Sequence, residues 1–373
     1  MRNNRFLYIN GRFFTQAITG TQRYGRELIR ELDALLQTDD RIKVEILVPA
    51  STVAEIPDYC NLTVRRVGKL TGHAWEQLEL PFYAWRGVLF CPVGGAPILH
   101  PRSVVTIHDV AVYAMPSGFT FAFGRWYRFL YWALGRRARH ILTVSNFSKN
   151  EIVRWCRIPP EKITVTHLGS EHAKAVAADS SILQRHDLKR YGYVLAASTR
   201  NPNKNLARLI ESLQFWDMPE MDFALAGKGF GAVYPSLKLR SSSIKELGHV
   251  TDQELRSLYE NAACFVFPSL YEGFGLPPLE ALALGCPVVA ADAASLPEIL
   301  AEAAIYCDPY DPTDIAQKIH SQIRSQHNPE SRMRLSLFAE QYSWKKCAQE
   351  TWRVLSDVTF DKDPSSGTPQ SER

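Results

Sequence analysis

Two glutamates, Glu272 and Glu280, stand on either side of a glycine- and proline-rich loop. Gly273 and Gly275 allow the backbone to approach a ligand closely, and free loop amides ahead of a helix face a negatively charged ligand. Two carboxylates in set positions accept hydrogen bonds from two groups of sugar hydroxyls. Apolar β-type runs flank the loop, so the stretch 264–292 predicts a strand, a loop, a helix and a second strand around such a ligand. Two surface glutamates on an ordinary loop are the alternative.

A pair of cations follows another apolar run, residues 193–197. Arg200 and Lys204 lie where this predicted strand leads into a predicted helix that extends to residue 213. The Arg200 guanidinium can bind two phosphate oxygens at once, and Lys204 supplies a compact charge. The pair therefore suggests a diphosphate site, with two exposed and solvated cations as the alternative.

The first half of the chain offers fewer chemically specific residues. His108 and Asp109 follow a predicted strand, residues 103–107, at the edge where parallel sheets bind ligands. A histidine satisfied within the core is the alternative for His108, and Asp109 is expected to orient His108 or a loop, or to contact a second substrate. Gly20 precedes a run of helically spaced apolar residues from 21 to 37, so it starts either an anion site or a plain turn.

The composition is that of a globular protein with two domains. The 373 residues are 46% hydrophobic, and alternating strand and helix patterns predict α/β domains with parallel sheets. Residues 1–190 carry 26 Lys and Arg against 16 Asp and Glu, whereas residues 191–373 carry 17 against 23. The basic first half favours an anionic partner, either a phospholipid surface or a diphosphate-bearing acceptor, and no nucleic-acid recognition signature accompanies it.

Cysteine usage and hydropathy indicate the cellular compartment of the protein. Seven scattered cysteines show neither a disulfide framework nor a zinc pattern, so we expect no metal and a reducing cytoplasm. No apolar run reaches the length of about 18 residues that a membrane span needs. The first residues, MRNNRFLYINGRFF, predict a strand at residues 6–9 rather than a secretory signal.

Residues 119–139 combine aromatic side chains with arginines and contain no acidic residue. Such a segment is typical of a helix on an anionic membrane surface, where each well-placed cation contributes about 1 kcal/mol. A helix that packs its aromatic rings into the core is the alternative, and both readings are compatible on different faces. The candidate membrane residues are Arg125, Arg128, Arg136, Arg137 and Arg139.

These motifs resemble those of a known family. Glu272-x7-Glu280, with Phe274-Gly275-Leu276 inside it and Gly-x-Pro-Val-Val after it, is similar to the signature of the retaining GT-B glycosyltransferases of family 4. Further segments that resemble the family are Trp75-Glu76-Gln77, residues 143–149 and Ser343-Trp344. The resemblance covers roughly residues 5–358, and its specific motifs lie in the second half.

The resemblance implies two Rossmann-like domains whose parallel sheets face a central cleft. We expect an acceptor-binding domain over residues 1–178 and a nucleotide-sugar-binding domain over residues 179–342. A helix over residues 343–359 would cross back to the first domain. Residues 360–373 are polar and rich in Pro, Ser and Gly, so they are expected to be disordered.

The resemblance also assigns catalytic roles. Glu272 and His108 would orient the donor sugar, while Arg200 and Lys204 would neutralise the leaving diphosphate. The expected catalytic residues are therefore His108, Glu272, Arg200 and Lys204. The expected donor-binding residues are Gly20, Arg200, Lys204, His249, Val250, Glu272, Gly273, Phe274, Gly275, Leu276 and Glu280.

Further roles concern the nucleotide and the acceptor. Glu280 would bind the ribose, and the backbone at His249 and Val250 would contact the base, although a helix capping box is sufficient to explain the residues that follow. Trp75 and Asp109 would contact the acceptor. A buried aromatic is the favoured interpretation of Trp75.

The expected activity is retaining, metal-independent transfer of a hexose, with GDP-mannose the favoured donor, to a lipid-linked or polysaccharide acceptor. The resemblance points to bacterial surface-glycan assembly, lipopolysaccharide included, by a cytoplasmic enzyme peripheral to the inner face of the cytoplasmic membrane. A sugar-nucleotide epimerase or hydrolase of the same fold, and a non-catalytic nucleotide-sugar-binding protein, are the alternatives. A nicotinamide dehydrogenase is disfavoured because no Gly-x-Gly-x-x-Gly follows the first strand.

Overall fold

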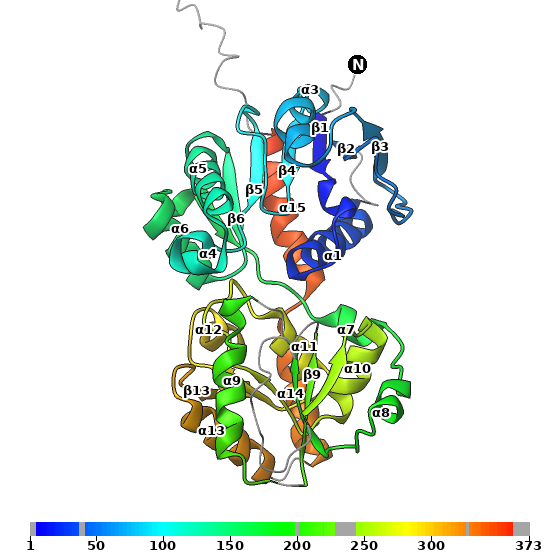
Figure 1. Cartoon of the computed structure of the whole chain (residues 1–373). Coiled ribbons are helices and arrows are strands. Elements are labelled where there is room, and N and C mark those ends of the chain that lie inside the picture. The colour runs from blue at the N-terminus through cyan, green and yellow to red at the C-terminus, as the bar shows by residue number, and fades with distance from the viewer. Residues whose placement is uncertain are drawn as a thin grey trace, which may run out of the picture.

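The computed structural model describes residues 5–36, 42–197, 201–218, 220–227, 244–325 and 328–360. These residues form two lobes that lie one above the other, each built on its own parallel sheet (Figure 1). Short apolar runs make the central strands, such as VLFC at β4 (Val88–Cys91) and CFVF at β11 (Cys264–Phe267), and every residue in them is buried. Helices cover both faces of such strands, so the predicted α/β units with parallel sheets are confirmed.

The first lobe contains a seven-stranded sheet in the order β3-β2-β1-β4-β5-β6-β7, with all neighbouring strands parallel. The chain reverses its direction of growth between β1 and β4, where α/β sheets bind ligands at the carboxyl ends of strands. Its other strands are β1 (Arg5–Asn10), β2 (Ile42–Pro49), β3 (Thr63–Val67), β5 (Ser103–Thr106), β6 (His140–Thr143) and β7 (Ile163–Val165). Its helices include α1 (Gly20–Leu35), α2 (Gly72–Ala74), the π-helical turn η3 (Trp75–Glu79), α3 (Leu80–Tyr83), α4 (Ala111–Ala114), α5 (Phe121–Arg137) and α6 (Asn146–Cys156).

The second lobe contains a six-stranded sheet in the order β10-β9-β8-β11-β12-β13. In its centre Phe265 of β11 lies beside Val288 of β12, and both are buried. Its other strands are β8 (Tyr193–Ala197), β9 (Asp222–Ala226), β10 (Ile244–Gly248), β12 (Val288–Ala291) and β13 (Ala304–Cys307). Its helices include α7 (Glu171–Ala175), α8 (Ser181–Arg185), α9 (Leu206–Ser212), α10 (Asp252–Asn261), α11 (Leu276–Ala283), α12 (Leu296–Leu300), α13 (Pro312–Arg324) and α14 (Pro329–Ala339).

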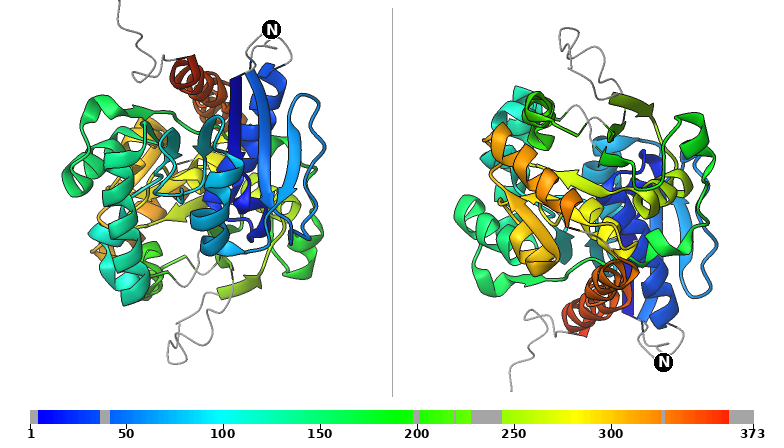
Figure 2. Two further views of the ribbon diagram at one scale, coloured as in Figure 1. Left: turned by 90° about the horizontal axis from the view of Figure 1, so that it is seen from above. Right: turned by 90° about the horizontal axis from the view of Figure 1, so that it is seen from below.

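The last helix, α15 (Trp344–Phe360), leaves the second lobe and packs against α1, β1, β4 and β6 of the first. On this face of the first sheet α1 and α15 share one core, whereas η3, α3, α5 and α6 contribute to a second core on the other face. Figure 2 shows α15, in red, extending along the outside of the first lobe in both views. The helix includes residue 360, which was expected to begin a disordered tail, and the rest of that tail lies outside the described residues.

The expected boundary between the two lobes, residue 178, follows the short helix α7 along the chain. Helix α7 already packs against α10 and α11 of the second lobe. Its sequence, EHAKA, is polar, so it gave no sign of which core it joins. The packing of α7 depends on partners more than 70 residues away along the chain, which a local pattern does not contain.

Capping residues and prolines in the sequence explain where helices α6, α10 and α11 begin. Ser145 caps α6 by accepting the N–H of Ser148 at 3.0 Å. Thr251 and Glu254 form the predicted capping box of α10, with both hydrogen bonds present. Prolines occupy the first turn of α11, where a missing N–H costs no intrahelical hydrogen bond.

Candidate active site

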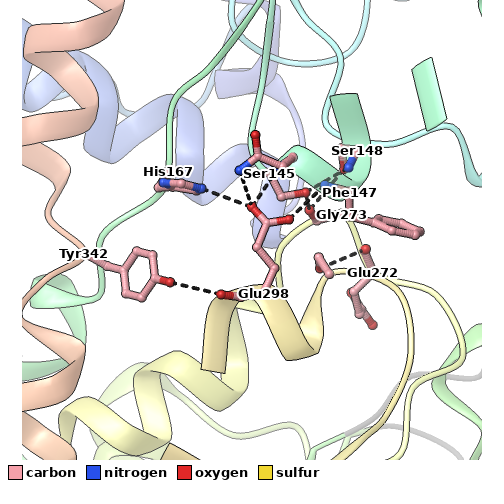
Figure 3. A network of polar contacts seen from close by, with 10 residues as sticks. Ser145, Phe147, Ser148, His167, Glu272, Gly273, Glu298 and Tyr342 are labelled. Carbon is pink, nitrogen blue, oxygen red and sulfur yellow. Dashed lines mark hydrogen bonds and ion pairs between the residues drawn. The ribbon is translucent and has the colours of Figure 1, made fainter. Parts of the chain in front are cut away.

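The glycine loop of the second lobe lies directly against the strand ends of the first. The carbonyl of Gly273 accepts hydrogen bonds from the hydroxyls of Ser145, at 2.6 Å, and Ser148, at 3.1 Å (Figure 3). Ser148 Oγ also lies 2.9 Å from the carbonyl oxygen of His108. A Cβ at residue 273 would lie 2.5 Å from that carbonyl oxygen, closer than real Cβ contacts. Any side chain at residue 273 would therefore push the lobes apart.

A carboxylate of the second lobe caps a helix of the first. Glu298, in α12, accepts hydrogen bonds from the backbone N–H groups of Asn146 and Phe147, both at 2.8 Å (Figure 3). The Asn146 side chain, at 3.0 Å, and His167 Nε2, at 3.3 Å, reach the same carboxylate. Burial raises the pKa of Glu298, but these hydrogen bonds outweigh it and leave the pKa below its usual value. Its charge also faces the positive end of the α6 dipole.

These contacts join the two lobes at the start of α6, next to the glycine loop. Ser295 Oγ donates to the carbonyl of Glu272 at 3.0 Å, so the loop is also anchored within its own lobe. The loop is thereby held from both lobes at once. We refer to Ser145, Ser148, Gly273 and Glu298 as the interlobe clasp.

The loop after Glu272 presents backbone donors. Among the described residues, none accepts a hydrogen bond from the amides of residues 273–276. Gly275 begins α11 with a φ of +97°, a conformation that suits glycine. Pro277 and Pro278 have no N–H, so the donors of this helix start are concentrated in the loop itself. Grouped amides at a helix N-terminus form an anion site.

Lys204 and Glu272 lie together beside this loop. Lys204 Nζ is 2.5 Å from Glu272 Oε1, and Ser269 Oγ donates to the same oxygen. Lys204 also lies over the ring of Phe267, 5.0 Å from its centroid. Both charged side chains are partly exposed, at 23% and 16%, so a ligand can reach them. The pair unites a cation and a carboxylate that were expected to bind neighbouring parts of one donor.

His108 contributes its backbone to the interlobe contact and turns its side chain inward. The imidazole is buried, and its Nε2 lies 2.9 Å from the carbonyl oxygen of Pro92. Because a carbonyl only accepts, Nε2 carries the proton. Burial lowers the pKa of His108 to about 4, although the Pro92 hydrogen bond partly opposes this shift. His108 is therefore neutral at neutral pH.

Asp109 lies next to the Lys204–Glu272 pair. Its Oδ1 accepts the N–H of Ala111 at 2.8 Å, which orients the turn into α4. Burial raises the pKa of Asp109, the Ala111 hydrogen bond lowers it, and the nearby Glu272 charge raises it further. The net pKa lies above its usual value, so Asp109 is a weaker acid than an exposed aspartate.

Glu280 faces the connection between the lobes. Its Oε1 lies 2.7 Å from His172 Nε2, and both side chains are buried. His172 Nδ1 in turn lies 3.0 Å from the indole nitrogen of Trp344. Arg23, from α1 of the first lobe, adds a positive charge near Glu280.

The expected base-binding turn lies beside a second bridge between the lobes. His249 is exposed and Val250 is half-buried, immediately before α10. Asp252 at the start of that helix pairs with Arg23 of α1 at 2.6 Å. Gly20, the first residue of α1, is exposed with open space around it. The first turn of α1 is thus brought to the start of α10, next to the expected base-binding turn.

Trp75 is a core residue, which corrects its expected contact with the acceptor. Its side chain is fully buried, and its indole N–H donates to the carbonyl of Val67 at 2.9 Å. The large ring packs in the core and its only polar group is already paired, so it presents nothing to a ligand. The adjacent Glu76 is fully buried as well and accepts hydrogen bonds from Arg12, at 2.8 Å, and Asn10, at 3.0 Å.

Helix α5 divides its side chains between the core and the surface. Leu130 and Leu134 are buried, whereas the rings of Phe121 and Trp132 are 77% and 47% exposed. The guanidinium of Arg136 lies 4.1 Å from the centroid of the Trp132 ring. The packing interpretation thus describes one face of this segment, and the membrane interpretation of its exposed face stays a prediction.

The candidate membrane arginines differ in their surroundings. Arg128 is half-buried and donates to the carbonyl of Val112 at 2.9 Å, so it serves the packing of α4 against α5. The other four, Arg125, Arg136, Arg137 and Arg139, are exposed.

Three expectations concern Arg200, metal binding and membrane spans. Arg200 lies outside the described residues. In the part of the chain that is described, no group of three or more His, Cys, Asp or Glu side chains could hold a metal ion. The helices described there include none whose length and apolar content would let it cross a membrane.

Sequence reasoning missed several residues that the fold brings to this site. Glu298, His172 and Arg23 carry no recognisable motif, and their partners lie 152, 108 and 229 residues away. Only Ser145 and Ser148 gave a local signal, and that signal indicated a helix cap. The contacts across the lobes depend on the meeting of two separately folded sheets.

Comparison with known proteins finds two family models that match this chain. Residues 182–342 match Glycosyl transferases group 1, and residues 73–174 match Glycosyltransferase Family 4. The chain is similar to the O-antigen chain mannosyltransferase B of Escherichia coli, with 29% identity over 90% of this chain and 95% of that protein. It is also 29% identical to the O-antigen chain mannosyltransferase RfbU of Salmonella typhimurium, over 58% of this chain and 59% of that protein.

The fold has solved counterparts. The structure of HepE from Anabaena, in complex with UDP and glucose, matches with a TM-score of 0.68 at 17% identity, over 95% of this chain and 100% of that one. This likeness supports the expected GT-B architecture of two Rossmann-like units. With one family match in each half and a similar protein along almost its whole length, the chain carries Glycosyl transferases group 1 and Glycosyltransferase Family 4 domains and is a glycosyltransferase.

Proposed function

We propose that this glycosyltransferase moves a mannosyl group from GDP-mannose, with retention of anomeric configuration, to a lipid-linked glycan during assembly of a bacterial surface polysaccharide. The observation that carries the proposal is the Lys204–Glu272 pair beside the clasped glycine loop. It brings a cation, a carboxylate and free amides to one place, as a sugar diphosphate requires. The similarity to two O-antigen mannosyltransferases favours mannose and a glycan acceptor.

In the proposed reaction, the acceptor hydroxyl attacks from the face that the diphosphate leaves, and the departing phosphate accepts its proton. Lys204, with Arg200, and the amides of residues 273–276 would stabilise the charge that develops on the phosphate. Binding of that phosphate would draw Lys204 away from Glu272, which frees the carboxylate to accept hydrogen bonds from the sugar. Protein groups supply this stabilisation, so the proposed mechanism requires no metal.

The proposed role of His108 differs from that of an acid or base. Its pKa of about 4 keeps the ring neutral, and its Nε2–H donates a hydrogen bond to the carbonyl oxygen of Pro92. His108 would therefore support the sugar site through its backbone carbonyl and the shape of its ring. Asp109 remains the proposed acceptor contact of the first lobe, since its carboxylate lies close enough to Glu272 and Lys204 to alter its pKa.

The test is a donor and acceptor matrix. Purified protein is incubated with GDP-mannose, UDP-glucose and UDP-galactose, each with and without a lipid-linked oligosaccharide, and nucleoside diphosphate release and product mass are measured. The proposal expects release from GDP-mannose that depends on the acceptor, together with a product one hexose heavier. Donor consumption without acceptor would favour a hydrolase or epimerase, and binding without turnover would favour a non-catalytic protein.

We also propose that the exposed face of α5 rests on an anionic membrane surface. Exposed rings such as Phe121 and Trp132 are suited to the lipid interface, and exposed arginines on the same helix attract anionic headgroups. The double variant Arg136→Glu/Arg137→Glu should abolish co-sedimentation with phosphatidylglycerol vesicles. The matched control Arg324→Glu/Arg334→Glu, on the second lobe, should bind as the wild type does; equal binding of both variants would refute the proposal.

A further inference from the structure

The two segments that connect the lobes cross at one point. One runs from β7 to α7 and the other from α14 into α15. A Cβ at Gly169 would lie 2.2 Å from the backbone nitrogen of Trp344, so the two backbones are in direct contact. The carboxylate of Glu171 accepts the Trp344 backbone N–H, at 3.0 and 3.2 Å from its two oxygens. The first residue of α15 is thereby tied to the first residue of α7.

A buried chain of hydrogen bonds leads from this crossing to Glu280. Trp344 Nε1 lies 3.0 Å from His172 Nδ1, and His172 Nε2 lies 2.7 Å from Glu280 Oε1. An indole N–H only donates, so His172 Nδ1 must accept and the imidazole proton resides on Nε2. That proton is donated to Glu280. Trp344 thus selects the one neutral tautomer of His172 that holds the carboxylate.

The hydrogen bonds that join Trp344, His172 and Glu280 are shielded from water. The side chains of His172 and Glu280 are 6% and 9% exposed, and Trp344 is buried as well. Hydrogen bonds shielded from water are stronger, and a lost partner is more costly there. No described residue hydrogen-bonds Glu280 Oε2, and the residue lines a small cavity together with Arg23 and Tyr259. One carboxylate oxygen is thus held while the other is left for a ligand.

We infer that Trp344 and His172 are positioning residues that orient Glu280 toward the hydroxyls of the nucleotide ribose. The inference rests on the proposed function and on the expectation, from the resemblance, that Glu280 binds the ribose of the donor. Through this chain, the connection between the lobes sets the direction of a ligand-binding carboxylate. Because α15 packs on the first lobe, the ribose site of the second lobe is built in part by a segment anchored on the first.

The experiment measures discrimination between ribose and dideoxyribose. Dissociation constants of GDP and 2′,3′-dideoxy-GDP, and of the corresponding uridine pair, are determined by calorimetry, and the base that binds more tightly is used. A carboxylate that accepts from ribose hydroxyls should make the wild type prefer the ribose form by about tenfold or more. Trp344→Phe keeps an aromatic ring at this position but removes the N–H, and should lower that preference at least about threefold. Trp352→Phe, on the same helix, is the matched control and should leave it unchanged.

A second pair of variants tests His172 directly. His172→Gln offers one acceptor and one donor at similar positions and should retain most of the ribose preference, whereas His172→Leu should lose it. A merely structural role would lower the affinity for both nucleotides equally and leave their ratio unchanged.

The variant Glu280→Ala distinguishes the ribose role of Glu280 from the positioning role of Trp344 and His172. If Glu280→Ala and the wild type show the same ratio, the proposed ribose role of Glu280 fails. If Glu280→Ala loses the preference while Trp344→Phe and His172→Leu retain it, the positioning role is overturned and the proposed function stands. Should Trp344→Phe fail to fold, as judged by circular dichroism, equal ratios for His172→Gln and His172→Leu would overturn the inference.

Discussion

The interlobe clasp predicts a measurable effect of removing a single charge. Glu298→Gln keeps the size of the side chain but turns one of its two accepting oxygens into an NH2 group. The wild-type carboxylate accepts two backbone N–H groups at 2.8 Å, and the amide can accept only one of them well. A hydrogen bond to a charged group contributes about 1.5–3 kcal/mol, and a charge at a helix N-terminus about 0.3–1 kcal/mol. Since the Glu298 side chain is 24% exposed, we expect a net loss of about 2 kcal/mol from the interlobe contact.

This loss should appear as lobe separation and lower turnover. A change of about 2 kcal/mol shifts an equilibrium roughly 30-fold, so kcat/KM for the donor should fall by about 10- to 30-fold if the closed arrangement is the reactive one. Small-angle X-ray scattering should show a larger radius of gyration for the variant. Glu302→Gln, at an exposed position of the same lobe, is the matched control. If Glu298→Gln and Glu302→Gln give equal radii and equal kcat/KM, the clasp does not govern the site.

Three further outcomes follow from the same site. Gly273→Ala places a Cβ 2.5 Å from the His108 carbonyl oxygen and should reduce kcat/KM about 100-fold, whereas Gly124→Ala, with open space around it, should not; a fully active Gly273→Ala would contradict the contact between the lobes. Lys204→Met should lower kcat by at least about 100-fold with a smaller change in KM, measured by initial rates, and an unchanged kcat would remove Lys204 from catalysis. For His108, a pKa depressed from 6.5 to about 4 means that the unfolded chain binds a proton which the folded chain excludes, so the free energy of unfolding should fall by about 3 kcal/mol as the pH drops through that window. The free energy of unfolding of His108→Gln, measured by urea unfolding at pH 7 and pH 4.5, should lack this decrease. If the free energy of unfolding falls by the same amount in the wild type and in His108→Gln, the histidine is not buried in its neutral form.

Much of the framework could be predicted from local pattern. The strand predicted at residues 193–197 coincides with β8, and those predicted at residues 6–9 and 103–107 match β1 and β5 to within one residue at each end, because short apolar runs between turn residues are typical of buried parallel strands. The capping box before α10 could also be predicted from the sequence, since its two partners are three residues apart. The spacing around Glu272 and Glu280 likewise indicated a strand, loop and helix whose backbone faces a ligand.

Other features were open until distant segments met. Trp75 suited both a core position and an acceptor contact, and only the packing of η3 beside β3 buried it. The aromatic residues of α5 suited both the core and a membrane, and the helix orientation decided which of them are buried and which are exposed. A composition shows which side chains prefer burial, but it does not state which face of a helix meets the sheet.

The sequence by itself determined the alternation of strands and helices and the chemistry of the glycine loop, because periodicity, capping and turn formation act over a few neighbouring residues. Only the tertiary structure decided that Glu298 caps α6, that Lys204 pairs with Glu272 and that Trp344 reaches Glu280 through His172. These partners lie far apart along the chain, and a hydrogen bond requires its donor and acceptor to lie within about 3.5 Å. That proximity arises only when the two lobes and the segments between them have packed.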